Sequence, residues 1–114
     1  MNSRDKGKRG ELKWRNQLRD AGFDAFRTAQ FAGNSPDGSP DVMCPSLPSI
    51  HHEVKWVERL NVQKAMDQAV RDAKPDQIPV VCHKKNDCPW LVTVRAEDWF
   101  RIIRNTDLVV GVGS

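Results

Sequence analysis

Residues 40–55, which read PDVMCPSLPSIHHEVK, are the stretch that decides how this chain is interpreted. Side chains alternate across a strand, so Glu53 and Lys55 are expected on one face and Val54 on the opposite face. A short apolar run starts directly after Asp41. We therefore expect a polar site in which Asp41 and Glu53 bind Mg²⁺, a cation that prefers oxygen ligands. Lys55 would hold a water or a phosphate oxygen beside the ion.

Length and charge limit the number of domains and the kind of partner that this chain can have. The 114 residues predict a single domain, residues 1–114, with one modest core. Lys and Arg outnumber Asp and Glu by 18 to 15, which gives a net charge of +3. Basic residues gather in an N-terminal arm, residues 1–8, which suits a phosphate-rich partner; a solvated, partly disordered arm is the alternative. The tail, residues 105–114, contains two glycines and is expected to fray or to pair with a partner chain.

The apolar and cysteine content indicate a cytoplasmic protein. No long apolar run is present, so neither a signal peptide nor a membrane span is expected. Three cysteines, an odd number without framework spacing, fit a reducing cytosol. Because neither a CxxC nor an HxxxH spacing occurs, buried structural cysteines are favoured over a zinc site.

The first helix is predicted over residues 8–21. Trp14, Leu18 and Ala21 share one stripe at helical spacing, and Gly22 is a natural stop. Glu11 lies seven residues before Leu18 and so falls on almost the same line. It is either a first-turn acid favoured by the helix dipole or a third acid reaching the Asp41–Glu53 site, and we favour the second reading.

The remaining elements follow from periodicity. Strands are predicted over residues 23–30, 42–44, 50–57, 78–83 and 90–94, and the second and third of these are expected to pair as a hairpin. A helix over 62–73 has Asn61 as its N-cap and ends before Pro75, and a last helix is marked by Ala96 and Ile103. Gln68 falls off the apolar stripe, so periodicity predicts a solvated surface position. The loop 31–40 contains another Pro-Asp pair, Pro36-Asp37. Because two turn residues follow Asp37, Asp41 is preferred as the site residue.

With these elements, four short motifs resemble those of the PD-(D/E)xK nuclease superfamily, and most closely its small phage and archaeal Holliday-junction resolvase-like nucleases. The motifs are residues 9–11 (RGE), 21–23 (AGF), 39–41 (SPD) and 53–55 (EVK). The resemblance implies an α/β, restriction-endonuclease-like fold, with a central mixed sheet of about five strands flanked by helices. It also implies a homodimer, in the host cytoplasm if the protein is phage-encoded. Some relatives carry a Gln at the position of Gln68.

The activity that the resemblance implies is Mg²⁺-dependent cleavage of DNA phosphodiester bonds, with Mn²⁺ as a substitute ion. Glu11, Asp41, Glu53 and Lys55 are then the expected catalytic residues, and the three acids the metal ligands. The residues that we expect to contact DNA are Lys8, Arg9, Arg27, Asn34, Ser35, Ser39, Lys84 and Lys85.

Three functions stay open at this point. The favoured one is cleavage of branched DNA such as a Holliday junction. A nicking or repair-type endonuclease acting on duplex or flap DNA is the first alternative. A non-catalytic DNA-binding protein of the same fold is the second. For a homodimer, the expected interface candidates are the large apolar residues Trp56, Trp90, Trp99 and Phe100 and the tail 108–110.

Overall fold

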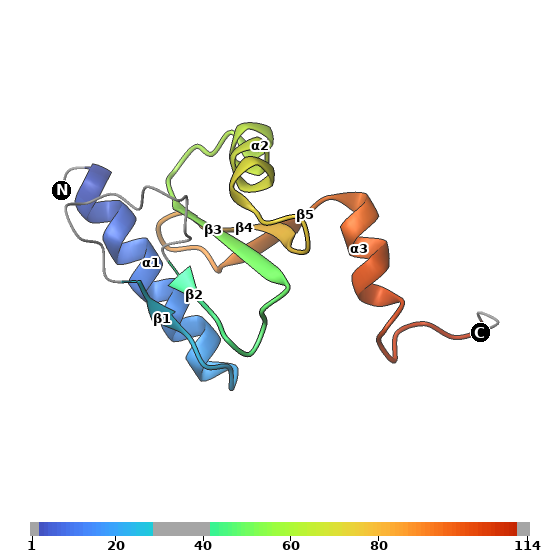
Figure 1. Ribbon diagram of the computed structural model, residues 1–114. Coiled ribbons are helices and arrows are strands. Elements are labelled where there is room, and N and C mark those ends of the chain that lie inside the picture. Colours follow the sequence, from blue (N-terminus) through green and yellow to red (C-terminus); the bar gives the residue numbers. More distant parts are fainter. Residues whose placement is uncertain (1–2, 29–41, 112–114) are drawn as a thin grey trace.

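The protein is described by a computed structural model that covers residues 3–28 and 42–111. Its elements follow the predicted order of helix, three strands, helix, two strands and helix (Figure 1). They are α1 (Ser3–Asp20), β1 (Phe26–Arg27), β2 (Val42–Met43), β3 (Ile50–Trp56), α2 (Val62–Asp72), β4 (Ile78–Lys84), β5 (Leu91–Val94) and α3 (Ala96–Ile103). The predicted mixed α/β architecture is therefore confirmed.

Helix α1 begins before its predicted start and ends where glycine was expected. It starts at Ser3, so most of the predicted N-terminal arm, residues 1–8, is helical. At the other end, Gly22 has a φ of +97°, a left-handed conformation that glycine adopts without a steric penalty. The Phe23 N–H donates to the Leu18 carbonyl and the Gly22 N–H to the Arg19 carbonyl, both at 3.0 Å. This pair of bonds is a Schellman motif, which satisfies the last carbonyls of the helix.

The five strands are divided between two sheets. In the three-stranded sheet, β4 lies in the centre, parallel to β3 and antiparallel to β5. In the two-stranded sheet, β1 and β2 are antiparallel. The predicted hairpin between residues 42–44 and 50–57 is therefore wrong. Turn hydrogen bonds from Leu47 to Cys44 and from Ile50 to Leu47 redirect the chain, and β3 pairs with β4 instead.

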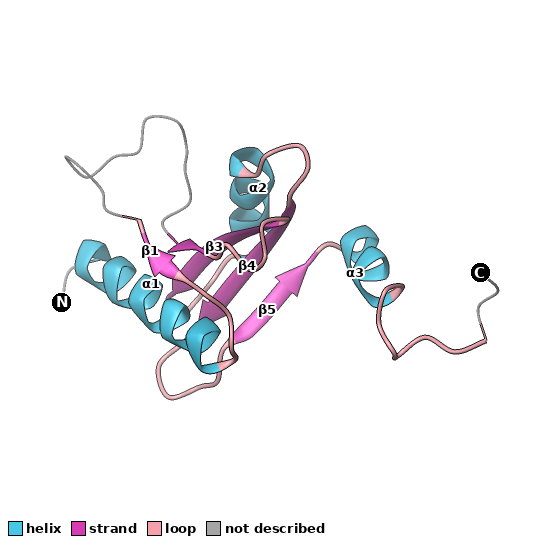
Figure 2. Ribbon diagram, turned by 60° about the horizontal axis from the view of Figure 1, so that its bottom comes forward, coloured by secondary structure: helices cyan, strands magenta, loops and turns pink. Residues whose placement is uncertain are grey.

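Helices α1 and α2 cover opposite faces of the three-stranded sheet, as Figures 1 and 2 show together. Gly10 lets α1 approach β3 closely, because a Cβ at this position would lie 3.1 Å from the Cβ of Trp56. Trp14 and Leu18 enter a buried cluster with residues of β2 and β4. On the other face, Ala65 and Ala69 of α2 pack in a second cluster with strand β4. Strand β3 is thus enclosed between two helices, and its side chains alternate between them.

Helix α3 projects away from the rest of the molecule (Figures 1 and 2). Two of its large apolar residues, Trp99 and Phe100, are 47% and 53% exposed. Asp98 is instead the buried residue of the helix, paired with Arg95 at 2.9 Å and Arg101 at 3.4 Å. Of the large residues proposed for an interface, Trp90 packs against Trp14 with ring centroids 5.1 Å apart, so it belongs to the core.

The prediction of buried cysteines is confirmed for two of the three. Cys44 and Cys82 are buried, Cys88 is half-buried, and all three are free thiols. Within residues 3–28 and 42–111, none of the helices combines the length and the apolar character needed to cross a membrane.

Candidate active site

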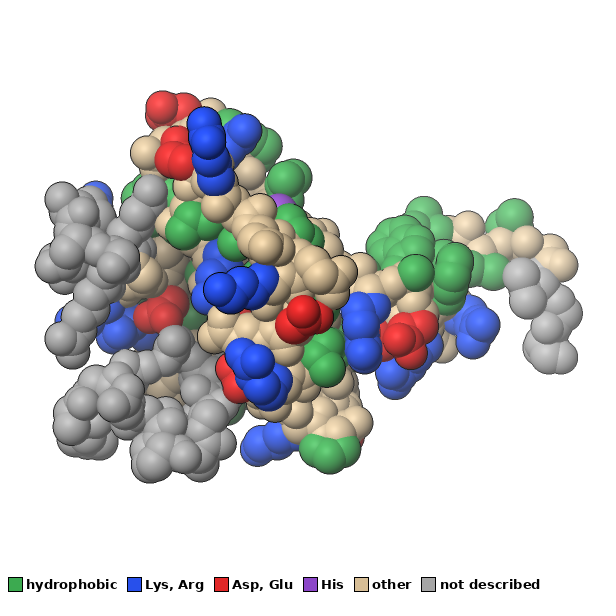
Figure 3. All heavy atoms as spheres, turned by 90° about the horizontal axis from the view of Figure 1, so that it is seen from above, with side chains coloured by type: hydrophobic (Ala, Val, Ile, Leu, Met, Phe, Trp, Pro, Cys, Tyr) green, Lys and Arg blue, Asp and Glu red, His purple; other side chains and the backbone are tan. Residues whose placement is uncertain are grey.

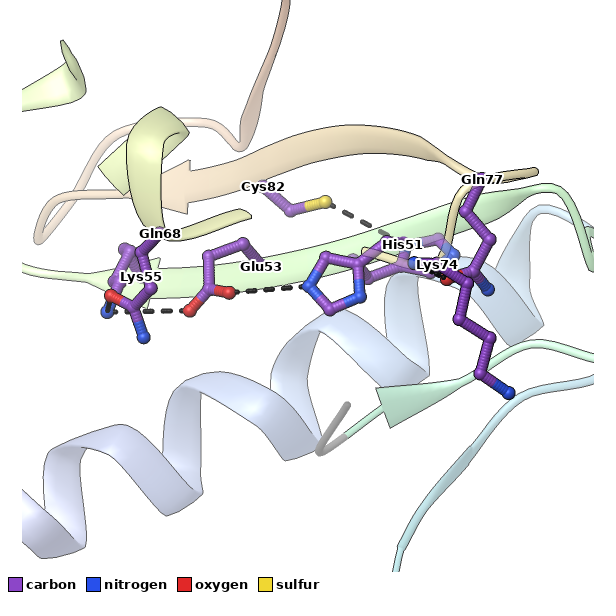
Figure 4. Close-up of polar contacts among 8 residues, drawn as sticks. His51, Glu53, Lys55, Gln68, Lys74, Gln77 and Cys82 are labelled. Carbon is purple, nitrogen blue, oxygen red and sulfur yellow. Dashed lines mark hydrogen bonds and ion pairs between the residues drawn. The ribbon is translucent and has the colours of Figure 1, made fainter. Parts of the chain in front are cut away.

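Strand β3 carries a connected row of polar side chains on the face that α2 covers (Figure 4). The Glu53 carboxylate places Oε2 3.6 Å from Lys55 Nζ and Oε1 3.4 Å from His51 Nε2. Lys55 Nζ in turn donates a hydrogen bond of 3.1 Å to Oε1 of Gln68 on α2. The predicted face shared by Glu53 and Lys55 is therefore confirmed, and the row continues to His51 and Gln68.

Gln68 is the residue that periodicity misplaced, whereas the resemblance pointed to a Gln in some relatives at this position. Periodicity predicted a solvated surface residue, but Gln68 is half-buried and holds the Lys55 ammonium. Gln68 lies three residues after buried Ala65 and directly before buried Ala69, at the edge of the face that α2 buries. Its contact with Lys55 depends on how this helix lies on the sheet, which periodicity alone does not reveal.

The opposite row of β3 faces α1 and is structural. Trp14 Nε1 donates a hydrogen bond of 3.1 Å to Nδ1 of His52, while Val54 packs against the core. This bond requires an unprotonated Nδ1. Burial, and secondarily the nearby His51, lower the pKa of His52 to about 4, so the ring is neutral near pH 7. Burial likewise raises the pKa of the adjacent Cys82 thiol, with the Glu53 charge as a smaller cause, and keeps the thiol protonated.

This buried imidazole predicts a loss of stability in mild acid. The pKa of His52 is lower in the folded chain (about 4) than in the unfolded chain (6.5). Protons therefore bind the unfolded state first, so the stability contribution is complete above pH 6.5 and is lost as the pH falls toward 4. The complete loss should be about 3 kcal/mol, of which about 2 kcal/mol falls between about pH 7 and about pH 5. Urea unfolding at these two pH values measures this difference. In His52→Gln, whose amide oxygen can still accept from Trp14, the difference should shrink; an unchanged difference would contradict this assignment.

Glu11 lies on the side of α1 that faces the two-stranded sheet. Its Oε1 is 3.0 Å from Nε of Arg27, and both side chains are largely buried, with 14% and 19% exposed. In the β1–β2 ladder, Arg27 is the Cα partner of Val42, the residue that follows Asp41 in the sequence. The ion pair thus ties α1 to the described start of β2. Arg27, predicted to contact DNA, spends at least part of its hydrogen-bonding capacity on Glu11.

The other predicted DNA contacts fall into three groups. Lys8, Arg9 and Lys85 are exposed, and Arg9 lies over the Trp56 ring, 5.8 Å from its centroid. Lys84 is half-buried, and its ammonium donates to the carbonyls of Cys88 and Lys85, so it closes the β4–β5 turn. Four of the predicted site residues lie outside the described residues, namely Asp41, Asn34, Ser35 and Ser39. Asp37 lies outside them as well.

The fold agrees with the comparisons with known proteins. The family model described as "Phage putative PDDEXK endonuclease" matches residues 2–112, so the chain belongs to this family of PD-(D/E)xK endonucleases. Among solved structures, the chain is similar to Hjc, a Holliday junction resolvase from the archaeal hyperthermophile Archaeoglobus fulgidus. The two share 28% identity over 77% of this chain and 76% of that chain, with a TM-score of 0.59. A search among curated proteins finds no match. The predicted superfamily and fold are confirmed, and family and fold together support a nuclease activity.

Proposed function

We propose that the chain is a Mg²⁺-dependent endodeoxyribonuclease that hydrolyses DNA phosphodiester bonds and prefers branched DNA such as a Holliday junction. The observation that carries this proposal is the row Glu53, Lys55 and Gln68, connected at 3.6 and 3.1 Å, in a chain of the PD-(D/E)xK endonuclease family. The similarity to an archaeal Holliday junction resolvase supports the preference for branched DNA.

The residues present fit a hard divalent cation. The Glu53 side chain is 13% exposed, so its carboxylate opens only narrowly to solvent, and carboxylate oxygens are the ligands that Mg²⁺ accepts. Asp41 and Glu53, completed by Glu11, would hold the ion. When bound, Mg²⁺ supplies Lewis-acid polarisation of the phosphate and lowers the pKa of a bound water. Mn²⁺ takes similar oxygen ligands and is the expected substitute.

Lys55 is positioned to act on the phosphate. Two groups, the Glu53 carboxylate and the Gln68 amide oxygen, fix the ammonium at 3.6 and 3.1 Å. Phosphoryl transfer needs positioning and charge stabilisation more than covalent chemistry. A pre-positioned cation costs no reorganisation when negative charge develops on the phosphate oxygens. Lys55 therefore orients the attacking water or stabilises that charge, and Gln68 keeps it in place.

A strong effect of Glu11→Gln on activity would support its place in the metal shell. The glutamine amide oxygen can still accept from Arg27, so folding should stay near normal, while the lost charge lowers cleavage strongly. Because α1 begins at Ser3, Glu11 lies in the third turn, and the predicted dipole role of a first-turn acid does not apply. If Glu11 served only to pair with Arg27, the change would affect stability and leave activity nearly unchanged. Turnover at saturating Mg²⁺, measured beside the free energy of unfolding, separates the two roles; unchanged turnover would exclude Glu11 from the site.

We also propose a homodimer, because cutting two strands requires two sites and a two-fold interface supplies them in fixed relation. The exposed apolar residues of the projecting C-terminal part support this: Trp99, Phe100, Leu108 and Val110 are 47%, 53%, 78% and 86% exposed. In Figure 3, hydrophobic side chains gather on one side of this projecting part and Lys and Arg on another. Such a contiguous exposed apolar surface is typical of a protein interface.

The dimer predicts a specific sedimentation result. The wild type should sediment as a dimer at micromolar concentration, and Phe100→Ser combined with Trp99→Ser should shift it to monomer and abolish paired incisions in a four-way junction. Leu12→Ser is the control, since Leu12 is an exposed apolar residue on α1 and should leave the dimer intact. A wild-type monomer that makes single nicks would overturn the homodimer.

One assay separates the proposed function from its alternatives. A labelled four-way junction and a linear duplex of the same sequence are incubated with the protein, with and without Mg²⁺. We expect Mg²⁺-dependent cleavage of the junction in preference to the duplex. Equal cleavage of both substrates, or nicking of the duplex alone, would favour the nicking or repair-type endonuclease. Binding without cleavage would favour the non-catalytic DNA-binding protein. The site of action that we propose, the host cytoplasm, is compatible with three free thiols.

A further inference from the structure

Two further side chains that can bind a metal ion, those of His51 and Asp72, lie near Glu53. His51 contacts Glu53 through Oε1, the oxygen that does not face Lys55. Among the described residues, His51, Glu53 and Asp72 offer ligand atoms that all lie within 4.8 Å of one another. His51 and Glu53 come from the same row of β3, and Asp72 is the last residue of α2. The covering helix therefore brings a second carboxylate to a strand that already presents an imidazole and a carboxylate, as Figure 4 shows for His51 and Glu53.

The distances suit coordination of a small cation. His51 Nε2 and Glu53 Oε1 are 3.4 Å apart. Two ligand atoms bound tetrahedrally at about 2.0–2.2 Å from one ion are separated by about 3.4 Å. A small adjustment of Asp72, whose ligand atom lies within 4.8 Å of both, would complete the set.

The buried imidazole of His51 presents its Nε2 to the proposed site. The residue is 2% exposed, and the 3.4 Å between Nε2 and Glu53 Oε1 is long for a hydrogen bond. Its Nδ1 has no hydrogen-bond partner among the described residues. No described partner therefore fixes the tautomer, and Nδ1 can carry the ring proton while Nε2 offers the lone pair that a metal ion requires.

We propose that His51, Glu53 and Asp72 form a binding site for a transition-metal ion of the Zn²⁺ type, which shares Glu53 with the proposed Mg²⁺ site. An imidazole nitrogen with two carboxylate oxygens is a donor set that suits such ions. Three protein ligands leave one position of a tetrahedral Zn²⁺ ion open to water. Mg²⁺ instead demands oxygen ligands in near-octahedral geometry and keeps its waters. Because the imidazole suits Zn²⁺ and not Mg²⁺, Zn²⁺ should bind the shared Glu53 even against an excess of Mg²⁺.

Glu53 connects this site with the proposed active site. Its Oε1 faces His51 and its Oε2 faces Lys55, so the two oxygens serve different neighbours. This connection rests on the proposed function, whereas Zn²⁺ binding itself does not. An ion on the His51 side would draw charge from the carboxylate that holds Lys55, so the two sites cannot be occupied independently.

Calorimetric titration with Zn²⁺ in a large excess of Mg²⁺ tests the inference. All samples carry Cys88→Ser, because Cys88 is the thiol that is not fully buried and would compete as a soft ligand. Asp72→Asn removes one ligand. Asp67→Asn is the matched control on the same helix, where Asp67 is exposed and accepts a hydrogen bond from Gln63. We expect one Zn²⁺ per chain in the parent and in Asp67→Asn. In Asp72→Asn, binding should weaken by at least about tenfold, since loss of even an outer-shell partner costs roughly 10–100-fold.

Two results would overturn the site: no Zn²⁺ binding in the presence of Mg²⁺, or equal affinity in Asp72→Asn and Asp67→Asn. X-ray absorption of the Zn²⁺-loaded parent decides even if Asp72→Asn misfolds. We expect scattering from one imidazole and no sulfur, and a shell without imidazole would exclude His51. A chain that cuts DNA but fails these tests would remove the inference and keep the proposed function. A chain that binds Zn²⁺ in this way but never cuts DNA would keep the inference and remove the proposed function.

Discussion

Glu53→Gln should reduce Mg²⁺-dependent cleavage by roughly 10²–10³-fold or more, the loss typical of removing one pre-positioned electrostatic group. Glutamine keeps the size of the side chain and one oxygen, so packing between β3 and α2 changes little. What disappears is the negative charge that Lys55 contacts at 3.6 Å and that we expect to bind the ion. Single-turnover cleavage of a labelled four-way junction, over a range of Mg²⁺ concentrations, measures the effect.

The control for this variant is Glu97→Gln. Glu97 lies in the first turn of α3, and its side chain is 73% exposed. Glu97→Gln makes the same change of charge outside the proposed site, and its cleavage rate should stay near that of the wild type. If Glu53→Gln cleaved as fast as Glu97→Gln, the proposed active site on β3 would be wrong.

Asp41→Ala should abolish cleavage while leaving DNA binding largely intact. Asp is a poor strand former, yet Asp41 directly precedes strand β2, which suggests that it is present for chemistry. Loss of a metal ligand should remove several kcal/mol of transition-state stabilisation, on the order of that seen for key electrostatic groups. Filter binding of the junction without metal, combined with cleavage rates in Mg²⁺, separates binding from catalysis.

Asp37→Ala is the matched control, because it changes the other Pro-Asp pair of the same segment. Its effect on the cleavage rate should be mild. A variant of Asp41 that cut at a near wild-type rate, or an Asp37 variant that lost activity instead, would move the metal site to the other aspartate. Both residues lie outside the described residues, so this comparison is the direct test of the preference for Asp41.

Local periodicity predicted the elements and the polar row of β3 well. Alternation along a strand is fixed by backbone geometry, so Glu53 and Lys55 had to share a face once residues 50–57 formed a strand. The ends of the helices were equally local: Gly22 adopts the left-handed conformation at the end of α1, and at the start of α2 the Asn61 side chain accepts from the Lys64 N–H at 3.0 Å. Such features depend on a few neighbouring residues and can be derived from them.

Pairing and long-range contact could not be derived in this way. Periodicity does not choose the partner of a strand, so the hairpin between residues 42–44 and 50–57 was expected where β3 in fact pairs with β4. Periodicity placed Gln68 on the surface for a related reason, because its contact with Lys55 depends on how α2 is rotated on the sheet. The roles of Glu11 and Asp41 in metal binding remain predictions.

The parallel pairing of β3 with β4 has a consequence for how the protein folds. Parallel strands need a long crossover connection, and here α2 forms it, so the Lys55–Gln68 contact joins a strand to its own crossover helix. Contacts of this kind are non-local, and their loop-closure entropy must be overcome before they contribute stability, which makes them slow to form. The proposed active site therefore assembles only when this β-α-β unit has closed. During refolding, activity should return with the final cooperative step, after the helices have formed.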